Sequence, residues 1–322
     1  MYVITGGAGF IGSAFARKLN QEGIDDIVIV DELKSSENWK NLRKISFIDY
    51  LHKDDFIAKI KTRSKDMSFK AIIHMGACSS TTETDADYML RNNYSYTRTL
   101  AEYAIEEGIR FIYASSGATY GDGSSGYSDN EQQLDYLKPL NIYGYSKHLF
   151  DLYARKKGYL KNICGLKFFN VFGPNEYHKA DMRSVALKSY LQIKQEGAVK
   201  LFKSYQQNFK DGEQKRDFIY VKDCIEVMWW LLNNNTPGLF NLGTGNARSW
   251  NDLVRAVFAA LQIEAKINYI EMPESLRKQY QYFTQADMEK LGSAGYKKGF
   301  HSLEDAVKDY IAGYLEQPDG YL

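Results

Sequence analysis

Short apolar runs alternate with longer amphipathic stretches along the first half of the chain. The runs that predict buried strands are residues 2–4, 27–30, 71–74 and 111–114. The stretches whose spacing predicts helices are residues 11–22, 88–107 and 143–157. Because strands and helices alternate, we expect an α/β fold in which residues 1–170 form a Rossmann-type, doubly wound parallel sheet.

The pattern changes after Gly173-Pro174, where longer segments rich in Lys, Gln and Tyr follow. We predict that residues 171–322 form a smaller, discontinuous substrate-binding lobe. Parts of residues 217–250 are expected to return to the first domain.

Two further apolar runs, residues 218–221 and 239–242, have the composition of buried strands. Residues 204–216 contain Gln-Gln, Asp-Gly and five charged side chains without apolar periodicity. We therefore expect an exposed loop at residues 204–216.

The charges of the chain are nearly balanced, with 41 basic and 40 acidic side chains among 322 residues. This balance gives no field that would attract nucleic acid or an anionic membrane, so we expect a small-molecule substrate.

Cys78, Cys164 and Cys224 lack the spacing of a zinc site or a disulfide framework, and we expect no bound metal. No apolar run approaches the roughly 18 residues of a membrane span. The first residues lead directly into a strand, so we expect a cytoplasmic protein.

A glycine-rich turn follows the first predicted strand. Residues 5–12 read Thr-Gly-Gly-Ala-Gly-Phe-Ile-Gly and place Gly6, Gly9 and Gly12 between that strand and the first helix. In this context glycines allow the backbone to approach a pyrophosphate at the helix N-terminus. We therefore expect the three glycines to bind a nicotinamide dinucleotide. A tight turn without a ligand is the alternative.

Acidic side chains end the second predicted strand. Asp31 stands about 20 residues after the glycines, where a carboxylate accepts hydrogen bonds from the adenosine ribose hydroxyls. This position favours NAD, and Glu32 adds a second charge that would repel the 2′-phosphate of NADP. Lys53 is a nearby cation that could bind such a phosphate. These residues leave the choice between NAD and NADP open.

Tyr143 and Lys147 stand four residues apart on one face of the third predicted helix. From there the ammonium can lower the tyrosine pKa and hold the nicotinamide ribose, so that the tyrosinate accepts a hydroxyl proton. Ser116 follows the strand at residues 111–114 and could hydrogen-bond the reacting oxygen. A YxxxK pattern also occurs by chance, and serine is common in turns. The three residues together favour oxidation of a sugar-like alcohol.

The complete set of motifs resembles the extended short-chain dehydrogenase/reductase family. Within that family, the ADP-heptose 6-epimerases contain segments similar to GACSSTTE, LNIYGYSK, FFNVFGPNEYHK, RDFIYV, FNLGTG and YFTQAD of this chain. The resemblance implies interconversion of ADP-D-glycero-D-manno-heptose and ADP-L-glycero-D-manno-heptose by transient oxidation at C6, for lipopolysaccharide inner-core precursors. It also implies a homo-oligomer, with a pentamer as one option.

Matching these motifs residue by residue implies roles for three groups of side chains. The residues implied to contact the cofactor are Phe10, Ile11, Asp31, Glu32, Lys53, Met75, Gly76, Ala77, Cys78, Ser79, Asn92, Lys147, Val171 and Lys179. The residues implied to line the substrate site are Asn170, Asp181, Lys188, Phe202, Lys203, Ser204, Tyr205, Arg216 and Tyr280. The implied acid/base groups are Tyr143 and Lys179, assisted by Ser116 and Lys147.

Four positions depart from the pattern of the family. Met75 stands where an acid is common, and Asn38 where a cofactor-binding lysine is common. Asp181 replaces a serine and Lys188 replaces a histidine. The family usually prefers NADP, so we expect NADP, and Asn38 together with Glu32 keeps NAD as the alternative.

Two of the implied roles have plain alternatives. Lys179 could be a solvated surface lysine in a polar loop. Arg216 could form an ordinary ion pair with Asp217, although an arginine fork suits the diphosphate of a nucleotide sugar.

Two other functions fit parts of the pattern. A nucleotide-sugar 4,6-dehydratase on the same fold commonly has an Asp-Glu pair where this chain has Gly117-Ala118. A catalytically silent dinucleotide sensor would not need Ser116, Tyr143 and Lys147 together. We therefore predict an epimerase.

Overall fold

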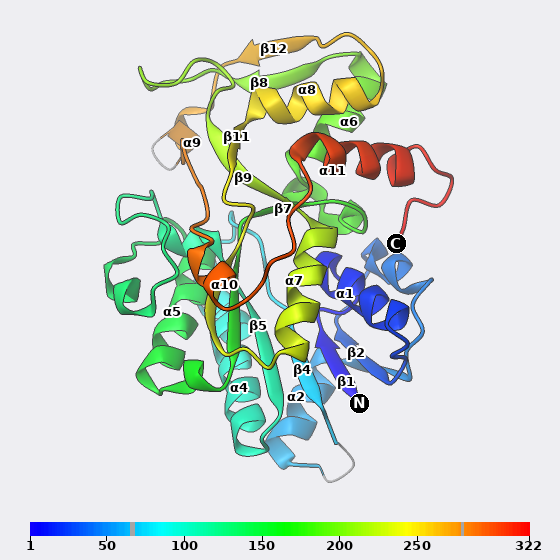
Figure 1. Ribbon diagram of the computed structural model, residues 1–322, viewed down its shortest axis with the longest axis vertical. Coiled ribbons are helices and arrows are strands. Elements are labelled where there is room, and N and C mark those ends of the chain that lie inside the picture. Colours follow the sequence, from blue (N-terminus) through cyan, green and yellow to red (C-terminus); the bar gives the residue numbers. More distant parts are fainter. Residues whose placement is uncertain (65–67, 278–279) are drawn as a thin grey trace.

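A parallel sheet of seven strands, ordered β10-β6-β5-β4-β1-β2-β3, forms the centre of the molecule (Figure 1). The computed structural model describes residues 1–64, 68–277 and 280–322. The strands of the sheet are β1 (Tyr2–Thr5), β2 (Ile27–Asp31), β3 (Asp49–His52), β4 (Ala71–His74), β5 (Arg110–Ser116), β6 (Cys164–Phe168) and β10 (Gly238–Leu242). Each pair of neighbours runs parallel, and the order steps outward from β1 in both directions. The doubly wound sheet predicted from the sequence is thus confirmed.

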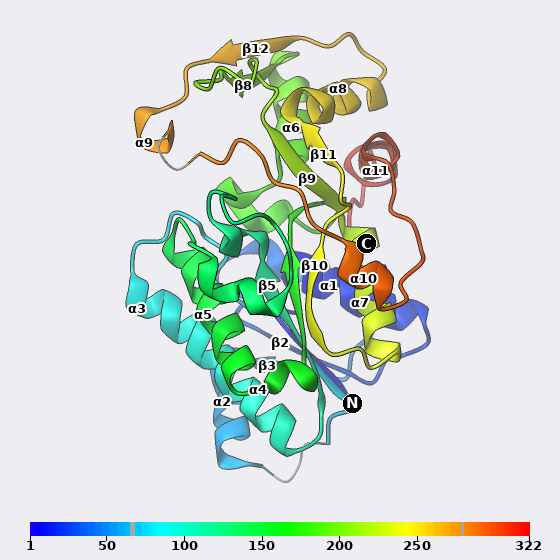
Figure 2. The ribbon, with the colours of Figure 1, turned by 60° about the vertical axis from the view of Figure 1, so that its left-hand side comes forward.

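Helices cover both faces of this sheet (Figures 1 and 2). One face carries α1 (Phe10–Gln21) and α7 (Val221–Asn233), and the other carries α2 (Lys53–Thr62), α4 (Tyr96–Glu106) and α5 (Ile142–Lys156). Successive strand residues point to opposite faces, so Ile4 joins the core under α1 and α7 whereas Val3 joins the core under α4. Both faces are buried, as parallel sheets require.

A smaller layer lies above the carboxyl ends of the strands (Figure 1). It contains a three-stranded sheet, β11-β9-β7, and a two-stranded sheet, β12-β8. Its strands are β7 (Asn170–Phe172), β8 (Val199–Phe202), β9 (Lys215–Tyr220), β11 (Ala247–Ser249) and β12 (Ile267–Ile270). The remaining helices of the chain are α3 (Ala86–Met89), α6 (Val185–Glu196), α8 (Trp250–Ala260), α9 (Glu274–Arg277), α10 (Glu289–Ser293) and α11 (Leu303–Tyr310).

The prediction of an exposed loop at residues 204–216 is wrong at its C-terminal end. Gln214 and Arg216 are buried, and β9 already begins at Lys215. The charged composition concealed this, because the side chains that cover Arg216 come from much later in the chain. The boundary between domains at residues 170 and 171 stays a prediction, and β10 joins the large sheet from within residues 217–250.

The described residues include no helix with the length and apolar character needed to cross a lipid bilayer.

Candidate active site

The glycine-rich turn lies directly against the loop that follows β4. Gly6 has φ = 64°, and a Cβ atom there would lie 2.6 Å from the amide nitrogen of Gly76. A Cβ atom at Gly12 would overlap the carbonyl oxygen of Gly6. Helix α1 begins one residue after Gly9, so its first-turn amides are available to an anion. The turn therefore offers the close backbone approach that a pyrophosphate requires.

Asp31 ends β2 beside this turn. Its carboxylate accepts hydrogen bonds from the amides of Ala8, at 2.8 Å, and Glu32, at 2.7 Å. Burial raises the pKa of Asp31, and these amide hydrogen bonds oppose that change. The two bonds fix the carboxylate next to the glycine-rich turn, where it can accept bonds from ribose hydroxyls.

Glu32 has two lysine partners. The amine of Lys53 lies 2.7 Å from a Glu32 carboxylate oxygen, and the amine of Lys34 lies 3.3 Å from the same oxygen. Lys53 also donates to the side-chain oxygen of Asn92, 3.3 Å away. Burial opposes the charge of Lys53, but the pair with Glu32 raises the pKa of this lysine overall. Two cations therefore surround Glu32, and our sequence analysis missed Lys34.

Asn38 and Asn41 are buried and form hydrogen bonds within the protein. The Ser36 hydroxyl donates to the buried side-chain oxygen of Asn38 at 2.7 Å. The buried Asn41 amide donates to the carbonyls of Ala8, at 2.9 Å, and Asn175, at 3.1 Å. This segment therefore braces the glycine-rich turn and supplies no charge to it.

Asn93 holds the loop that follows β4. Its side-chain oxygen accepts from the Cys78 amide at 2.8 Å, and its side-chain nitrogen donates to the Cys78 carbonyl at 2.9 Å. The same nitrogen donates to the Ser146 hydroxyl of α5, 3.0 Å away. Residues 75–79 are thus fixed against α5, with Cys78 half-buried.

Helix α5 carries both members of the YxxxK pair. The side chain of Asn141 caps it by accepting from the Gly144 amide at 2.8 Å, so the helix begins one residue before Tyr143. The Lys147 amine is buried and donates to the carbonyl oxygen of Ala114 on β5, 2.8 Å away. Burial lowers the pKa of Lys147 to about 8.

Ser116 is the last residue of β5 and contacts Tyr143. The expectation that Lys147 lowers the pKa of Tyr143 is wrong. Burial raises the pKa of the Tyr143 hydroxyl, and the group that opposes this rise is the Ser116 side chain, through a hydrogen bond. The Ser116 hydroxyl oxygen also accepts from the Ala118 amide at 3.1 Å. The structure therefore places Tyr143 beside Ser116 at the carboxyl end of β5, and Lys147 one helical turn further along α5.

Lys179 lies in the 3-10 helix η6 (Tyr177–Met182). Its amine lies over the ring of Phe10, 5.3 Å from the ring centroid. Burial lowers the pKa of Lys179, and the buried carboxylate of Glu176 opposes that change. The next residue, Ala180, has φ = 45°, which is unusual for an alanine. The half-buried Lys179 is therefore not a freely solvated surface lysine.

Arg216 lies between two aromatic rings of the upper layer. Its guanidinium carbon lies 5.5 Å from the Trp250 centroid and 5.4 Å from the Tyr280 centroid. Trp250 donates its indole N–H to the Tyr280 hydroxyl at 2.9 Å, so the two aromatic residues on either side of Arg216 are hydrogen-bonded to each other. We call Trp250 and Tyr280 the aromatic clamp. The guanidinium donates to the carbonyls of Lys215, at 2.8 Å, and Gln281.

The alternative of an Arg216–Asp217 ion pair is wrong. The Asp217 carboxylate accepts from the amide and hydroxyl of Thr244, both at 2.7 Å, and from the amides of Gly245 and Ala286 at 2.9 and 3.0 Å. In the part of the chain that the structure describes, Arg216 has no carboxylate partner, and burial lowers the pKa of its guanidinium. A buried, uncompensated guanidinium is suited to an anionic ligand.

Residues 202–205 run from β8 into the loop that follows. Lys203 forms an ion pair with Glu271 at 2.7 Å, and the Tyr205 hydroxyl donates to the same carboxylate. The Arg277 guanidinium stacks on the Tyr205 ring, 3.8 Å from its centroid. These contacts tie the segment to residues near Tyr280.

Two positions that depart from the family pattern contact each other. The amine of Lys188, in the first turns of α6, donates to the carbonyl oxygen of Asp181 at 2.6 Å. On β7, Asn170 is exposed and Val171 is half-buried.

Among the described residues, no group of three or more His, Cys, Asp and Glu side chains could hold a metal ion.

Comparison with known proteins adds a family to this geometry. The model of the NAD dependent epimerase/dehydratase family matches residues 2–243, about three quarters of the chain. The chain belongs to this family. The matched residues include the glycine-rich turn and the Tyr143–Lys147 pair.

Members of this epimerase/dehydratase family that resemble the chain have been given specific names. An ADP-L-glycero-D-manno-heptose-6-epimerase of Nitratidesulfovibrio vulgaris (strain DP4) is 57% identical over 323 residues, covering all of both chains. A protein of the same name from Fusobacterium nucleatum is 49% identical, again over both full lengths. The resemblance noted from the sequence motifs is thereby confirmed.

Solved structures of the family have the same fold. The Helicobacter pylori ADP-L-glycero-D-manno-heptose-6-epimerase superposes with a TM-score of 0.83 at 28% identity, covering 97% of this chain and 95% of that one. A Thermus thermophilus UDP-glucose 4-epimerase in complex with NAD reaches a TM-score of 0.78 at 21% identity, covering 97% of each chain. The second likeness concerns the fold alone.

Several residues of this epimerase/dehydratase site were missed from the sequence. Asn41, Asn93 and Trp250 act through bonds to segments far away in the chain, and a single sequence gives no sign of those contacts. Lys34 could have been found, because it stands only two residues after Glu32.

Proposed function

We propose that this protein is an ADP-heptose 6-epimerase, which interconverts ADP-D-glycero-D-manno-heptose and ADP-L-glycero-D-manno-heptose. The observation that carries the proposal is the meeting of Tyr143, Ser116 and Lys147 beside a dinucleotide-type glycine turn. Named relatives at 49% and 57% identity over full length support the choice of substrate.

The residues around the glycine-rich turn fit a nicotinamide dinucleotide. The turn admits no side chain at Gly6 or Gly12, as a pyrophosphate cradle demands, and Asp31 is fixed beside it. A dinucleotide held there would supply a hydride acceptor for C6 of the heptose and a hydride donor to the other face of the resulting ketone. Lys147 is the residue that would hold the nicotinamide ribose.

The cofactor we propose is NADP. Lys34 and Lys53 together offset the charge of Glu32, so the edge beside Asp31 can accept a 2′-phosphate. NAD remains the alternative, because Asp31 suits a free ribose and Asn38 carries no charge that could bind a 2′-phosphate. The relative amounts of NAD and NADP released from denatured protein, identified by mass spectrometry, decide between them.

Tyr143 and Lys179 supply the proton transfers of the proposed reaction. Tyr143, beside Ser116, would take the C6 hydroxyl proton of one epimer as hydride leaves, and the Lys179 ammonium would donate a proton to the ketone oxygen when hydride returns to the other face. Lys179 would serve the epimer whose oxygen lies on the other side. Its lowered pKa brings a neutral, proton-accepting amine closer to physiological pH.

Arg216 is the residue that would bind the diphosphate of the substrate. It is buried, lacks a carboxylate partner in the described chain, and its aromatic clamp aligns the guanidinium. Residues 202–205 and Tyr280 would line the sugar-nucleotide site around it.

The place of the enzyme in lipopolysaccharide precursor synthesis, in the cytoplasm and as a homo-oligomer, is part of the same proposal. The names of the relatives support ADP-heptose as the substrate, and this substrate implies the pathway.

Incubation with ADP-D-glycero-D-manno-heptose, followed by NMR spectroscopy of the C6 configuration, tests the proposed function. We expect a mixture of the two epimers without added oxidant. Unchanged substrate in the presence of both NAD and NADP would overturn the assignment.

A further inference from the structure

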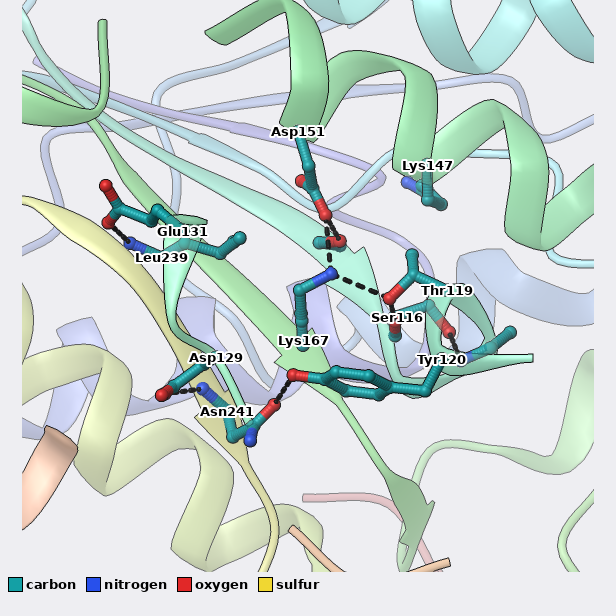
Figure 3. A network of polar contacts seen from close by, with 12 residues as sticks. Ser116, Thr119, Tyr120, Asp129, Glu131, Lys147, Asp151, Lys167, Leu239 and Asn241 are labelled. Carbon is teal, nitrogen blue, oxygen red and sulfur yellow. Dashed lines mark hydrogen bonds and ion pairs between the residues drawn. The ribbon is translucent and has the colours of Figure 1, made fainter. Parts of the chain in front are cut away.

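Helix α5 carries a third polar residue in line with Tyr143 and Lys147. Asp151 follows Lys147 by four residues, so all three lie on one face of the helix. The Asp151 side chain is 0% exposed, and it forms an ion pair at 2.8 Å with Lys167, which is equally buried (Figure 3).

The Asp151 carboxylate holds the end of β5. It accepts from the Tyr113 hydroxyl at 2.9 Å and from the Ser115 hydroxyl at 2.7 Å. Both donors lie on the strand that ends in Ser116. Asp151 therefore joins the strand carrying Ser116 to the helix carrying Tyr143.

Lys167 extends this connection to Ser116 itself. Its amine, on β6, also donates to the Thr119 hydroxyl at 2.7 Å (Figure 3). The Thr119 hydroxyl in turn donates to the carbonyl oxygen of Ser116 at 2.8 Å. The Asp151–Lys167 pair thus holds the segment around Ser116 through hydrogen bonds on either side of that residue.

Asp151 is also the acidic group that acts on Lys147. The titratable groups that act on the Lys147 amine are His74 from β4, Cys78 from the loop after β4, and Asp151 from α5. Burial lowers the pKa of His74 to about 3, so this ring is neutral at physiological pH. In the described chain Lys147 makes no direct ion pair, and its hydrogen-bond acceptor is the Ala114 carbonyl.

Stability alone gives little reason for such a pair. A buried ion pair is often no more stabilising than apolar side chains of similar size, because both charges lose their hydration. The bonds that link this pair to the segment around Ser116 point instead to a role in the site.

We propose that Asp151 is a positioning residue for the reaction: it fixes Ser116 relative to Tyr143, and its negative charge keeps the Lys147 amine protonated. The role of Asp151 in the reaction rests on the proposed function, whereas its effect on the charge of Lys147 does not. The charge of Lys147 can be measured without substrate or cofactor.

The test is an NMR titration of protein labelled with 13C at the lysine ε-carbons. The Lys147 signal is identified by its loss in Lys147→Arg. In Asp151→Asn we expect the midpoint of the Lys147 titration to fall by about one pH unit, because the opposite charge is lost and Lys167 remains. Ser115→Ala removes a hydrogen bond to Asp151 without changing any charge, and should leave the midpoint in place.

Equal Lys147 midpoints in the unmodified protein and in Asp151→Asn would overturn the inference. If Asp151→Asn does not fold, the double variant Asp151→Asn/Lys167→Met removes both charges together, and a lower midpoint is again expected because Asp151 lies one helical turn from Lys147 whereas Lys167 belongs to the separate strand β6. In a parallel turnover assay, inactive unmodified protein would count against the epimerase proposal and not against the role of Asp151.

Discussion

The Lys179 amine lies over the Phe10 ring, 5.3 Å from the ring centroid. Phe10 is the first residue of helix α1 and directly follows the N-cap residue Gly9. Tyr143, in contrast, contacts Ser116 at the end of β5. In the sheet, β4 lies between β5 and the strand that precedes α1. Inverting one carbon places the alcohol oxygen on different sides in the two binding poses, so two separated acid/base groups suit the reaction.

Replacing Lys179 by methionine should abolish epimerisation but preserve one half-reaction. The apolar side chain keeps contact with Phe10 but cannot carry a proton, so only the epimer served by Tyr143 should reduce the bound cofactor. Stopped-flow absorbance of reduced nicotinamide, measured with each epimer, checks this. Lys194→Met is the matched control, because Lys194 is an exposed lysine paired with Glu316. Equal half-reaction rates for the two epimers in Lys179→Met would remove Lys179 from the mechanism.

Tyr143→Phe should lower turnover by roughly 10²–10⁴-fold and reverse the epimer preference seen in Lys179→Met. The ring is retained and only the hydroxyl is lost, so the cofactor should still bind. Turnover and dinucleotide content are measured on the same preparation. A near-normal rate would show that Tyr143 is not the proton acceptor.

Turnover should decline above about pH 8. Burial lowers the pKa of Lys147 to about 8, so the ammonium is present below that pH and is lost above it. The charged form is the one that would hold the nicotinamide ribose in the proposed reaction. In Lys147→Arg the side chain stays charged, so the alkaline decline should disappear even if the rate at pH 7 is lower. A profile that stays flat to pH 9.5 in the unmodified enzyme would contradict this reading of Lys147.

Lys34→Gln and Lys53→Gln should each weaken NADP binding by about tenfold and leave NAD binding nearly unchanged, since only NADP carries the 2′-phosphate. Glu32→Gln should favour NADP. Dissociation constants come from fluorescence titration with both reduced cofactors. Lys70→Gln is the control, because Lys70 directly precedes β4 and so lies at the amino ends of the parallel strands, away from the carboxyl ends that Lys34 follows. Equal losses for NAD and NADP would assign Lys34 and Lys53 a purely structural role.

Arg216→Ala should weaken substrate binding by about 1.5–3 kcal/mol through loss of a charge-assisted contact with the diphosphate. Trp250→Phe keeps the guanidinium but removes the indole bond to Tyr280, so its effect should be smaller. Calorimetric titration with ADP-heptose measures both. An affinity unchanged in Arg216→Ala would place the diphosphate elsewhere.

The strands that the sequence pattern predicted have mostly apolar runs without a charged residue, although β10 contains Asn241 and β4 ends in His74. The strand β3 was missed because Asp49–His52 is a polar edge strand whose side chains are largely half-buried. The strand β6 was missed because Lys167 interrupts its apolar run, and this lysine can be buried there only because Asp151 meets it. Periodicity cannot reveal a charge that is neutralised by a residue elsewhere in the chain.

The site could be predicted where its chemistry is local. The glycines, Asp31 and the Tyr143–Lys147 pair stand at spacings fixed by one turn or one helix. Arg216 was predicted to lie in an exposed loop because its coverage comes from Trp250 and Tyr280, 34 and 64 residues later. Contacts of this kind follow from the topology of the upper layer, which no local motif encodes.

The most direct test of the account follows the hydrogen at C6. ADP-D-glycero-D-manno-heptose carrying deuterium at C6 is incubated with the enzyme in ordinary water, and the product is analysed by NMR and mass spectrometry. Transient oxidation within one site predicts that the inverted product retains its deuterium at C6, because the same hydride returns. Inverted product with hydrogen from water at C6 would contradict transient oxidation and would require another route to inversion.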